Sequence, residues 1–355
     1  MKKILFKSAF IACVSLALFT SVFTGCKSTD TPVAVADQTK LKASIDSCQA
    51  IADTVSVKSF KQSDIDTFKS LLATVKTTAA NSAISQSAVD NLLIQLRTAK
   101  STFLAAALSA IPSSALLMAL TFDEGTGTQL ITKGTKAWTA VLMAGPSQLF
   151  GTATGLPTFV AGHKGTGYAI HFGSGSHLEI SNYTSPDLLK SQMSIAVWLK
   201  TDATYVGNYI MSYNYWNTWK FQLQDGDLPF FTTHVAPDLY TDADDAGTKV
   251  PVATWTHVVV SLDLTAGTLT FYVNGANVKQ WTKTDRPNLM STLTPYATVL
   301  PLMIGAQTTY AEAIATNQGP TLANWNYFHG AMDELKVYSV ALSDGQVSKL
   351  YNTEK

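Results

Sequence analysis

Cysteine is scarce in this sequence, with three in 355 residues: Cys13, Cys26 and Cys48. The first two belong to an apolar N-terminal segment and its end, so Cys48 is left without a partner once that segment is removed. This excludes a disulfide framework and a cysteine-based zinc site. Charge is scarce as well, since charged residues make up 14% of the chain and the formal net charge is zero. A nucleic-acid partner is therefore not expected, because phosphates need a basic surface.

Two further absences narrow the range of functions. No apolar stretch of membrane-spanning length follows the N-terminal segment. The six histidines show no metal-ligand spacing, so zinc binding and histidine-based catalysis are not expected.

The N-terminus has the pattern of a secretion signal. Lys2 and Lys3 precede a nearly uninterrupted apolar stretch over residues 4–23, as in cleaved signal peptides. The next residues up to Cys26 read Thr-Gly-Cys, which resembles the lipobox of bacterial lipoproteins. The resemblance implies that residues 1–25 are removed and that Cys26 carries a lipid anchor. Residues 26–37 then form a flexible tether. An ordinary signal peptide with an incidental cysteine and an uncleaved anchor helix are the alternatives.

Residues 38–110 have the apolar period of helices. One apolar stripe includes Cys48, a second follows an expected N-cap at Ser63, and a third follows Ser85. Three such helices bury their stripes best as an antiparallel bundle, with Cys48 as a buried apolar residue. Residues 87–92 resemble the FIVAR three-helix modules of extracellular bacterial polysaccharide-active proteins, which implies a spacer. A bundle that binds a partner of its own is the alternative.

From residue 113 onwards the period changes to that of strands. Alternating apolar residues predict a strand over residues 116–122, and Asn274-Gly275 predicts a type I′ hairpin turn. Further strands are predicted over residues 168–172, 177–180, 193–200, 209–212, 219–223, 256–262, 268–273 and 331–338. Many strands with almost no helix predict a mainly β domain over residues 113–355, built as an antiparallel two-sheet sandwich.

Four segments of this region resemble the laminin-G-like, concanavalin A-type jelly rolls: residues 194–200, 255–260, 269–275 and 330–343. They occur in the family's order and span most of the region. The resemblance implies an antiparallel two-sheet jelly-roll sandwich of the concanavalin A-like lectin/glucanase type. Because this fold hosts both lectin-like binders and glycoside hydrolases, the fold alone does not decide the function.

A glycoside hydrolase needs two carboxylates that flank the sugar bond. The resemblance implies a Glu-x-Asp-x-x-Glu pattern on one strand, and this pattern is absent here. The glutamates of the domain are few and isolated: Glu124, Glu179, Glu312, Glu334 and Glu354. Asp333 and Glu334 are adjacent, and strand alternation sends them to opposite faces. We therefore expect no enzyme, and a hydrolase or lyase with an unrecognised site is the alternative.

Two aspartates are candidates for a structural calcium site. Asp333 is expected to share the core-facing side of its strand with Leu335 and Val337, where an acid must be hydrogen-bonded or metal-bound. The jelly-roll resemblance implies calcium near the first and last strands, and Asp123 is then the second ligand. The alternative is that Asp333 only accepts backbone hydrogen bonds. The acid-rich residues 242–247 are predicted to form a solvated loop.

Aromatic and amide side chains gather in two short stretches. Aromatic planes match the apolar faces of sugars, and amides match their hydroxyl groups. Six side chains are therefore predicted to contact a glycan: Tyr213, Tyr215, Trp216, Asn217, Trp325 and Tyr327. The alternative is that these rings belong to the core, which is the prediction for Trp198, Trp219 and Trp255.

Together these features predict a non-catalytic carbohydrate-binding protein that captures a polysaccharide or oligosaccharide. The resemblances imply a surface lipoprotein of a gut-type Gram-negative bacterium, anchored in the outer membrane and facing the cell exterior. Other surface glycan-uptake proteins are then potential partners. An adhesion or assembly protein that binds another protein is the second hypothesis.

Overall fold

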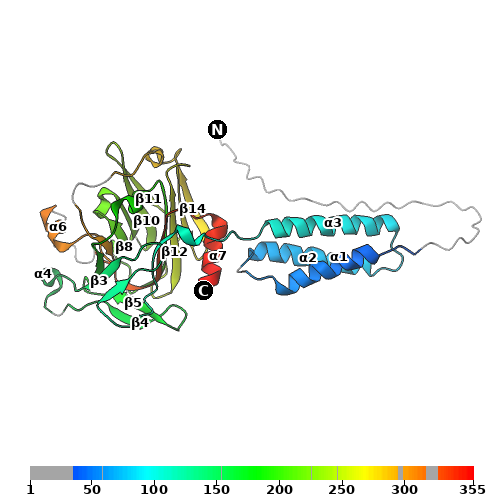
Figure 1. Cartoon of the computed structure of the whole chain (residues 1–355), viewed down its shortest axis with the longest axis horizontal. Helices are drawn as coiled ribbons and strands as arrows, with labels where there is room; N and C mark the ends of the chain where they lie inside the picture. The colour runs from blue at the N-terminus through cyan, green and yellow to red at the C-terminus, as the bar shows by residue number, and fades with distance from the viewer. Residues whose placement is uncertain are drawn as a thin grey trace, which may run out of the picture.

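The computed structural model describes residues 35–355, except residues 58, 153, 225, 246, 295–298 and 317–326 and the side chain of Trp216. The predicted signal peptide, the lipidated Cys26 and Trp325 therefore lie outside the described residues. Figure 1 shows two parts, a helical bundle and a β-sandwich, which lie end to end along the long axis of the molecule. Within the described ranges, no helix is long and apolar enough to cross a membrane.

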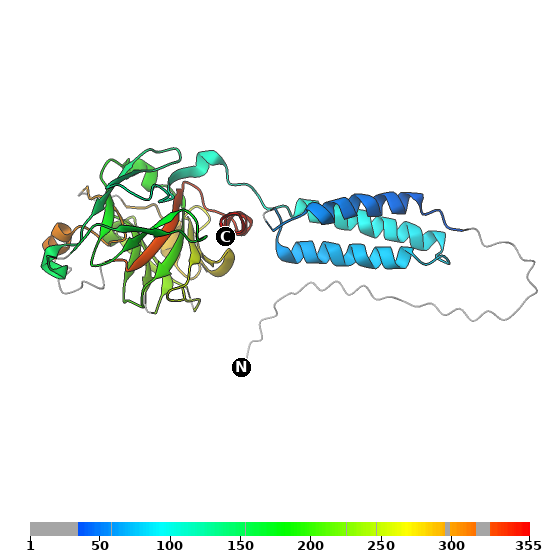
Figure 2. The ribbon, with the colours of Figure 1, turned by 90° about the horizontal axis from the view of Figure 1, so that it is seen from below.

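Three helices form the bundle: α1 (Thr39–Thr54), α2 (Gln62–Ala79) and α3 (Gln86–Ala105). Figure 2 shows them lying side by side. The predicted cap at Ser85 is confirmed, because its side chain accepts a hydrogen bond from the backbone N–H of Ala88. The cap predicted at Ser63 is wrong. Helix α2 already begins at Gln62, and its N-cap residue Lys61 makes no side-chain capping bond.

The bundle has an apolar core of its own. The ring of Phe103 stacks on those of Phe60 and Phe68, with centroid distances of 4.2 and 4.5 Å. Cys48 is fully buried in this core, as predicted, and burial raises the pKa of its thiol. The core shares no residue with that of the sandwich, which indicates that the two parts are stabilised separately.

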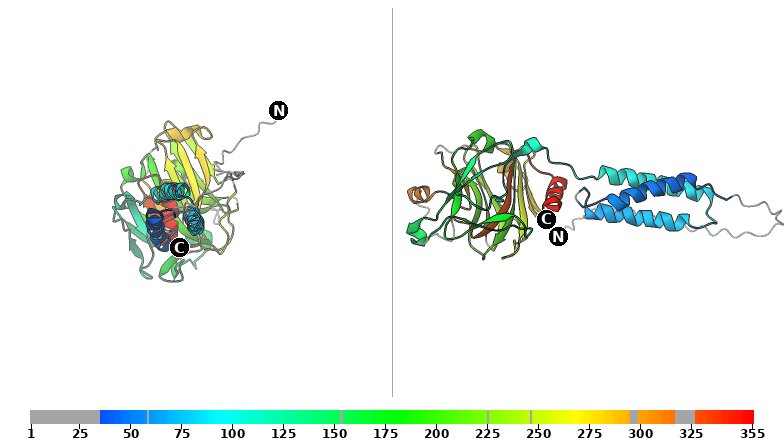
Figure 3. Two further views of the ribbon diagram at one scale, coloured as in Figure 1. Left: turned by 90° about the vertical axis from the view of Figure 1, so that its right-hand side faces the viewer. Right: turned by 60° about the horizontal axis from the view of Figure 1, so that its bottom comes forward.

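The sandwich consists of two antiparallel sheets, seen from two further directions in Figure 3. Sheet A has the strand order β14-β13-β12-β7-β16-β5-β4, and β1 also pairs with β16. Its strands are β1 (Leu116–Leu120), β4 (Thr158–Ala161), β5 (Tyr168–Phe172), β7 (Gln192–Thr201), β12 (Thr256–Asp263), β13 (Thr268–Val273), β14 (Ala276–Thr282) and β16 (Gly330–Tyr338).

Sheet B has the strand order β11-β10-β9-β8-β15-β6-β3-β2. Its strands are β2 (Gln129–Ile131), β3 (Thr139–Met143), β6 (His177–Ile180), β8 (Asn208–Tyr213), β9 (Trp219–Gln224), β10 (Leu228–Val235), β11 (Leu239–Asp244) and β15 (Leu302–Ile304). The helical segments of the sandwich are η1 (Ser113–Ala115), α4 (Ser147–Phe150), α5 (Ser185–Leu188), η2 (Tyr215–Asn217), η3 (Pro287–Met290), α6 (Tyr310–Ala315) and α7 (Asp344–Glu354).

This architecture confirms the predicted fold class, a mainly β chain with two antiparallel sheets preceded by helices. The core lies between the sheets and is built by alternation. In β9, Trp219, Phe221 and Leu223 point inward and are fully buried, as predicted for Trp219. Strands β2, β3, β4, β10, β11, β14 and β15 and the helical segments of the sandwich, α7 among them, are additions to the predicted elements.

Helix α7 packs on the outer face of sheet A. It begins with a capping box between Ser343 and Gln346. Val347 of the helix is buried against Ala196, Val259 and other outward-facing residues of the sheet. Figure 1 shows α7 on the side of the sandwich that is turned towards the bundle, whereas sheet B lies on the opposite side.

Strand β11 forms one edge of sheet B, and side chains cover its free carbonyl groups. Trp281 Nε1 donates to the carbonyl oxygen of Asp244 at 2.6 Å, and Asn288 Nδ2 donates to that of Tyr240 at 3.1 Å. Between them, Arg286 Nε donates to the carbonyl oxygen of Asp242 at 3.3 Å. Every second carbonyl along this edge therefore has a partner from the segment that follows β13.

A bulge in β16 changes which face its residues occupy. The backbone of Glu334 has a φ of 51°, and the pairing register with β7 shifts between Asp333 and Lys336. Leu335 and Val337 lie in the core, as expected. The prediction that Asp333 shares their face is wrong. The extra residue turns Asp333 to the outer face of sheet A, where it is paired with Trp198 of β7.

Candidate functional site

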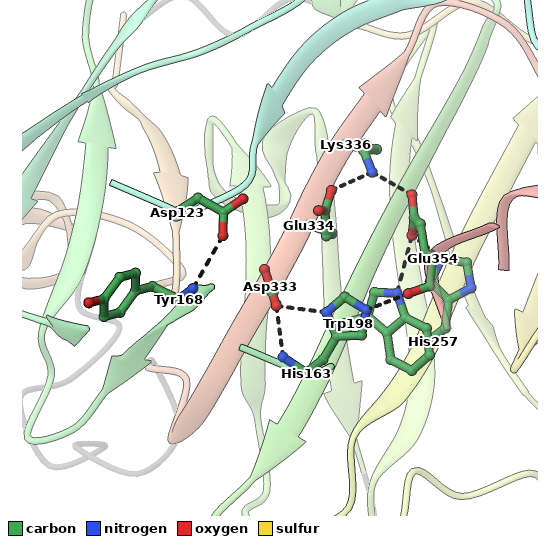
Figure 4. Close-up of polar contacts among 9 residues, drawn as sticks. All are labelled: Asp123, His163, Tyr168, Trp198, His257, Asp333, Glu334, Lys336 and Glu354. Carbon is green, nitrogen blue, oxygen red and sulfur yellow. Dashed lines mark hydrogen bonds and ion pairs between the residues drawn. The ribbon is translucent and has the colours of Figure 1, made fainter. Parts of the chain in front are cut away.

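Polar side chains gather on the outer faces of both sheets. On sheet A, beneath α7, the gathering contains both acids of β16 that the sequence singled out, Asp333 and Glu334 (Figure 4). We call it the sheet A cluster and define it by seven residues: His163, Trp198, His257, Asp333, Glu334, Lys336 and Glu354.

His163 is held between two acceptors. Its Nδ1 lies 2.7 Å from Asp333 Oδ2, and its Nε2 lies 2.8 Å from the backbone carbonyl oxygen of Glu354. Because both partners accept, both ring nitrogens must donate, which requires the charged imidazolium. Burial lowers the pKa of His163, but the hydrogen bonds to Asp333 and Glu354 outweigh burial and raise the pKa above its usual value.

The side chain of Glu354, at the end of α7, is buried against the same sheet. It accepts a hydrogen bond from Trp198 Nε1 at 3.1 Å and forms an ion pair with Lys336. Lys336 also pairs with Glu334 at 2.5 Å, and although burial opposes it, the two carboxylates raise the pKa of Lys336. His257 beside them is neutral, because burial and the charge of Lys336 lower its pKa to about 3.

The sheet A cluster has the properties of a structural anchor. Its carboxylates are paired with cations or hydrogen-bond donors, and one of them, that of Glu354, comes from α7 itself. Trp198, predicted to be core, is indeed buried, but it lies under α7 and stacks on His163 at 4.4 Å instead of lying between the sheets. The side chain of Asp333 is 6% exposed and bonded to His163, and that of Glu334 is 20% exposed and paired with Lys336.

The two predicted calcium ligands bind the two ends of the turn between β4 and β5. Asp333 Oδ2 accepts from the backbone N–H of His163 at 2.9 Å, and Asp123 Oδ1 accepts from that of Tyr168 at 3.2 Å. Gly167 lies so close that a Cβ there would be 2.3 Å from Asp123 Oδ1, which explains the glycine. The described residues contain no group of three or more side chains arranged for a metal ion. These contacts match the alternative that Asp333 only accepts backbone hydrogen bonds. Calcium binding by Asp123 and Asp333 stays a prediction.

A row of outward-facing side chains crosses sheet B. Pairing registers join them in this order: Val141, Glu179, Met303, Ser212, Lys220, Thr232 and Asp242. They point away from the core because their neighbours along the strands, such as Phe221 and Phe231, point into it. Lys220 stands near the middle of this row.

The ammonium group of Lys220 is fixed by its neighbours. Its Nζ lies 2.8 Å from Gln222 Oε1 and 3.2 Å from the hydroxyl oxygen of Tyr209. The ring centroid of Phe230 is 5.4 Å away. Burial lowers the pKa of Lys220 to about 8, against the opposite effect of Asp242. An ammonium group has three donors, and these two acceptors engage two of them.

Two aromatic rings flank the polar row where it reaches β10 and β11. Phe230 is half-buried, and Tyr240 is 37% exposed and stacks on His234 at 4.2 Å. Tyr240 pairs with His234, four positions along β10 from Phe230, so the two rings stand about 13 Å apart. We call Lys220, Thr232 and Asp242 with these two rings the sheet B site.

The ring of His234 is held at both nitrogens. Nδ1 lies 2.8 Å from the backbone carbonyl oxygen of Asn217, and Nε2 lies 2.8 Å from Asp238 Oδ1. These contacts orient His234 under Tyr240 and connect η2, where the sequence placed part of the glycan site, to the sheet B site.

The six predicted glycan contacts have different outcomes in the structure. The prediction for Tyr213 is wrong, because its side chain is 1% exposed and lies within the sandwich core. Tyr215 and Tyr327 are likewise buried, so burial and not ligand contact accounts for these rings. Burial also raises the pKa of both hydroxyl groups. Asn217 is half-buried at the edge of the sheet B site. The side chain of Trp216 and the whole of Trp325 lie outside the described residues.

Within the acid-rich stretch, residues 242–244 belong to a strand and are not the solvated loop that the sequence predicts. Asp242 and Asp244 are the last residues of β11 and face solvent, Ala243 between them lies in the core, and Asp245 is buried. Asp242 Oδ1 accepts a hydrogen bond from Thr232 Oγ1 at 2.6 Å. The exposed-buried alternation is that of an edge strand with one face on the core.

The distances between the acids on sheet B decide which of them could form a hydrolytic pair. Glu179 on β6 and Asp242 on β11 are separated by five strand spacings, about 24 Å in total. A hydrolytic pair stands about 5 to 10 Å apart, so these two acids do not form one. Asp242 and Asp244 are closer, at alternate positions of the same edge strand. They are therefore the pair to test for the hydrolase alternative.

Comparison with known proteins agrees with this fold. Residues 172–348 match the family model described as the concanavalin A-like lectin/glucanases superfamily, of laminin G type. No curated protein matches the chain. Among solved structures, domain 4 of a GH43 extracellular arabinanase from Geobacillus stearothermophilus, in complex with arabinotriose, is similar. It has 19% identity and a TM-score of 0.46, and the match covers 66% of this chain and 98% of that chain.

Another similar structure is the binding domain of botulinum neurotoxin DC in complex with SialylT. It has 9% identity and a TM-score of 0.47, and the match covers 68% of this chain and 52% of that chain. The family match, the strand order and the paired antiparallel sheets agree with one another. The sandwich that follows the helical bundle is thus a domain of the concanavalin A-like lectin/glucanase type.

Proposed function

We propose that this protein binds a carbohydrate at the sheet B site without cleaving it. The observation that carries the proposal is the arrangement of Phe230 and Tyr240 on either side of the polar row of Lys220, Thr232 and Asp242. Rings about 13 Å apart can each cover the apolar face of a sugar unit, while Lys220 and Asp242 between them offer a donor and acceptors to hydroxyl groups. The family match to lectins and glucanases agrees with a glycan as the ligand.

The placement of the sheet B site supports this function. Figure 1 shows sheet B on the side of the sandwich away from the bundle. If Cys26 carries a lipid, the tether and the bundle act as a spacer, and the site faces away from the membrane. We therefore propose an anchored, cell-surface, glycan-capturing lipoprotein, with Trp216 and Trp325 as further ligand contacts.

The test is glycan-array screening of the purified full-length protein, followed by calorimetry with the glycan that binds. Phe230→Ala and Tyr240→Ala should each lower affinity about 30-fold, because truncation of a ring that anchors a ligand typically costs about 2 kcal/mol. Tyr168→Ala is the matched control. This ring is 46% exposed but belongs to β5 of sheet A, so its loss should leave affinity unchanged.

Three results would count against the proposal. Equal affinity of wild type and both ring variants places the site elsewhere on the molecule. Binding to no glycan, combined with capture of a protein ligand that Phe230→Ala abolishes, supports the adhesion hypothesis. Release of reducing ends by the wild type, abolished by Asp242→Asn or Asp244→Asn, identifies a hydrolase.

A further inference from the structure

The sheet B site carries more negative than positive charge. On the outward positions of β9, β10 and β11 the described side chains include one cation, Lys220, and two carboxylates, Asp242 and Asp244. The turn between β10 and β11 adds Asp238, whose side chain is 80% exposed. Asp238 is paired with the ring of His234 at 2.8 Å, so the formal sum is taken over the other three groups and is −1.

Lys220, the cation of the site, is hydrogen-bonded to uncharged side chains. Lys220 Nζ is hydrogen-bonded to an amide oxygen and a phenol oxygen, those of Gln222 and Tyr209, and Asp242 is the nearby charge that favours its protonated form. Among the described residues, the other basic side chain on the outward positions of these strands is His234, which is paired with Asp238. A carboxylate or sulfate on a ligand would therefore meet one partly buried ammonium group and two acids, Asp242 and Asp244, beside the His234–Asp238 pair.

The neighbouring cations at the sheet edge are engaged elsewhere. Lys279 Nζ lies 3.8 Å from the ring centroid of Trp281, and the Arg286 guanidinium lies 4.1 Å from the same centroid. Arg286 also donates to the backbone carbonyl oxygens of Asp242 and Asp285. These two side chains therefore close the edge of β11 and do not form an anion pocket on its outer face.

From this charge arrangement we infer that the ligand is an uncharged glycan and that the sheet B site discriminates against uronate-containing and sulfated chains. The inference rests on the proposed function. A carboxylate about 7 Å from one acid in water loses about threefold in affinity. With a net charge of −1 the expected discrimination is about threefold at low ionic strength. It should shrink in high salt, where screening acts within a few ångströms.

The experiment compares each neutral polysaccharide with its own acidic derivative. Pullulan, galactomannan and hydroxyethyl cellulose are offered to the full-length protein, and any that binds is oxidised at C6 to the uronate and measured again. Reduction of the uronate back to the alcohol is the chemical control. We expect the oxidised chain to bind about threefold more weakly in 20 mM salt, and the reduced chain to regain full affinity.

Charge variants locate the effect. The double variant Asp242→Asn, Asp244→Asn should abolish the discrimination and bring the ratio of the two affinities to about one, since it removes both acids that are not paired with a histidine. Asp202→Asn, an exposed acid beside His171, is the matched control and should leave the ratio unchanged.

The outcomes separate this inference from the proposed function. Tighter binding of the oxidised chain, with loss of affinity in Phe230→Ala, overturns the uncharged-ligand inference while carbohydrate binding stands. The same holds if the ratio is unchanged in the double variant. Binding to no neutral and no acidic glycan overturns the proposed function itself.

Discussion

The sheet A cluster predicts how stability depends on pH. His163 must be an imidazolium to donate to both Asp333 and the backbone of Glu354, and its pKa in the folded protein is raised. A cation with a raised pKa stabilises the fold fully below its unfolded value, about 6.5. That stabilisation is lost as the pH rises through the folded value. Substitution of Asp333 by Asn removes the carboxylate that contributes most to this rise.

The magnitude follows from the burial of the pair. The side chains of His163 and Asp333 are 5% and 6% exposed, and their atoms are 2.7 Å apart. A hydrogen bond between charged partners in such a place contributes about 1.5–3 kcal/mol. For a domain of this size that corresponds to a fall in Tm of about 3–12 °C. We therefore expect Asp333→Asn to lower Tm by this amount at pH 6, and by progressively less towards pH 9.

Thermal unfolding of the wild type and of Asp333→Asn, followed by circular dichroism from pH 5 to pH 9, measures this difference in Tm. The contributions of other titrating groups largely cancel, because both proteins carry those groups. Asp202→Asn is the matched control. It removes an acid from another histidine pair, His171 and Asp202, with a similar distance of 2.9 Å but side chains that are 33% and 49% exposed. An exposed pair contributes at most about 1 kcal/mol, so Tm should change little. A loss in Asp333→Asn that is the same at pH 5 and pH 9 would refute the imidazolium assignment.

Three other predictions address the remaining parts of the chain. Cys26→Ser should abolish lipid labelling and membrane partitioning; continued labelling with palmitate contradicts the lipobox. A chain that starts at Ser113 should fold alone as a β protein, because the two cores share no residue, and circular dichroism of a disordered chain would show that the bundle is needed. If Asp123 and Asp333 bind calcium, EDTA should lower Tm and added calcium should restore it. An unchanged Tm would show that the two aspartates act only through their hydrogen bonds.

Local sequence signals account for most of the elements that were predicted correctly. The strand over residues 268–273 and its Asn274-Gly275 turn have the predicted limits, with both turn residues at positive φ. The start of helix α7 is also marked in the sequence, since Ser343 and Gln346 have the spacing of a capping box. The strand β11 was harder, because three acids in four residues resemble a loop unless Ala243 is known to face the core.

The sheet B site could not be derived from local patterns. Lys220, Phe230 and Tyr240 belong to three different strands, and only the pairing register brings them to one face. The aromatic stretch that the sequence singled out lies beside this face, but strand alternation turns Tyr213 inward. The face of Asp333 was predicted incorrectly for a similar reason, because one residue with a φ of 51° inverts the alternation and a glutamate gives no sign of it.

The covered edge of β11 has a consequence for chains crowded together on a surface. An open edge strand offers its carbonyl and amide groups to any other strand, so dense arrays of β proteins risk pairing into aggregates. Trp281, Arg286 and Asn288 occupy three alternate carbonyl groups that an incoming strand would need. Under the proposed function, copies anchored close to one another would stay separate and would engage one long polymer together, and the gain in binding strength would come from their number.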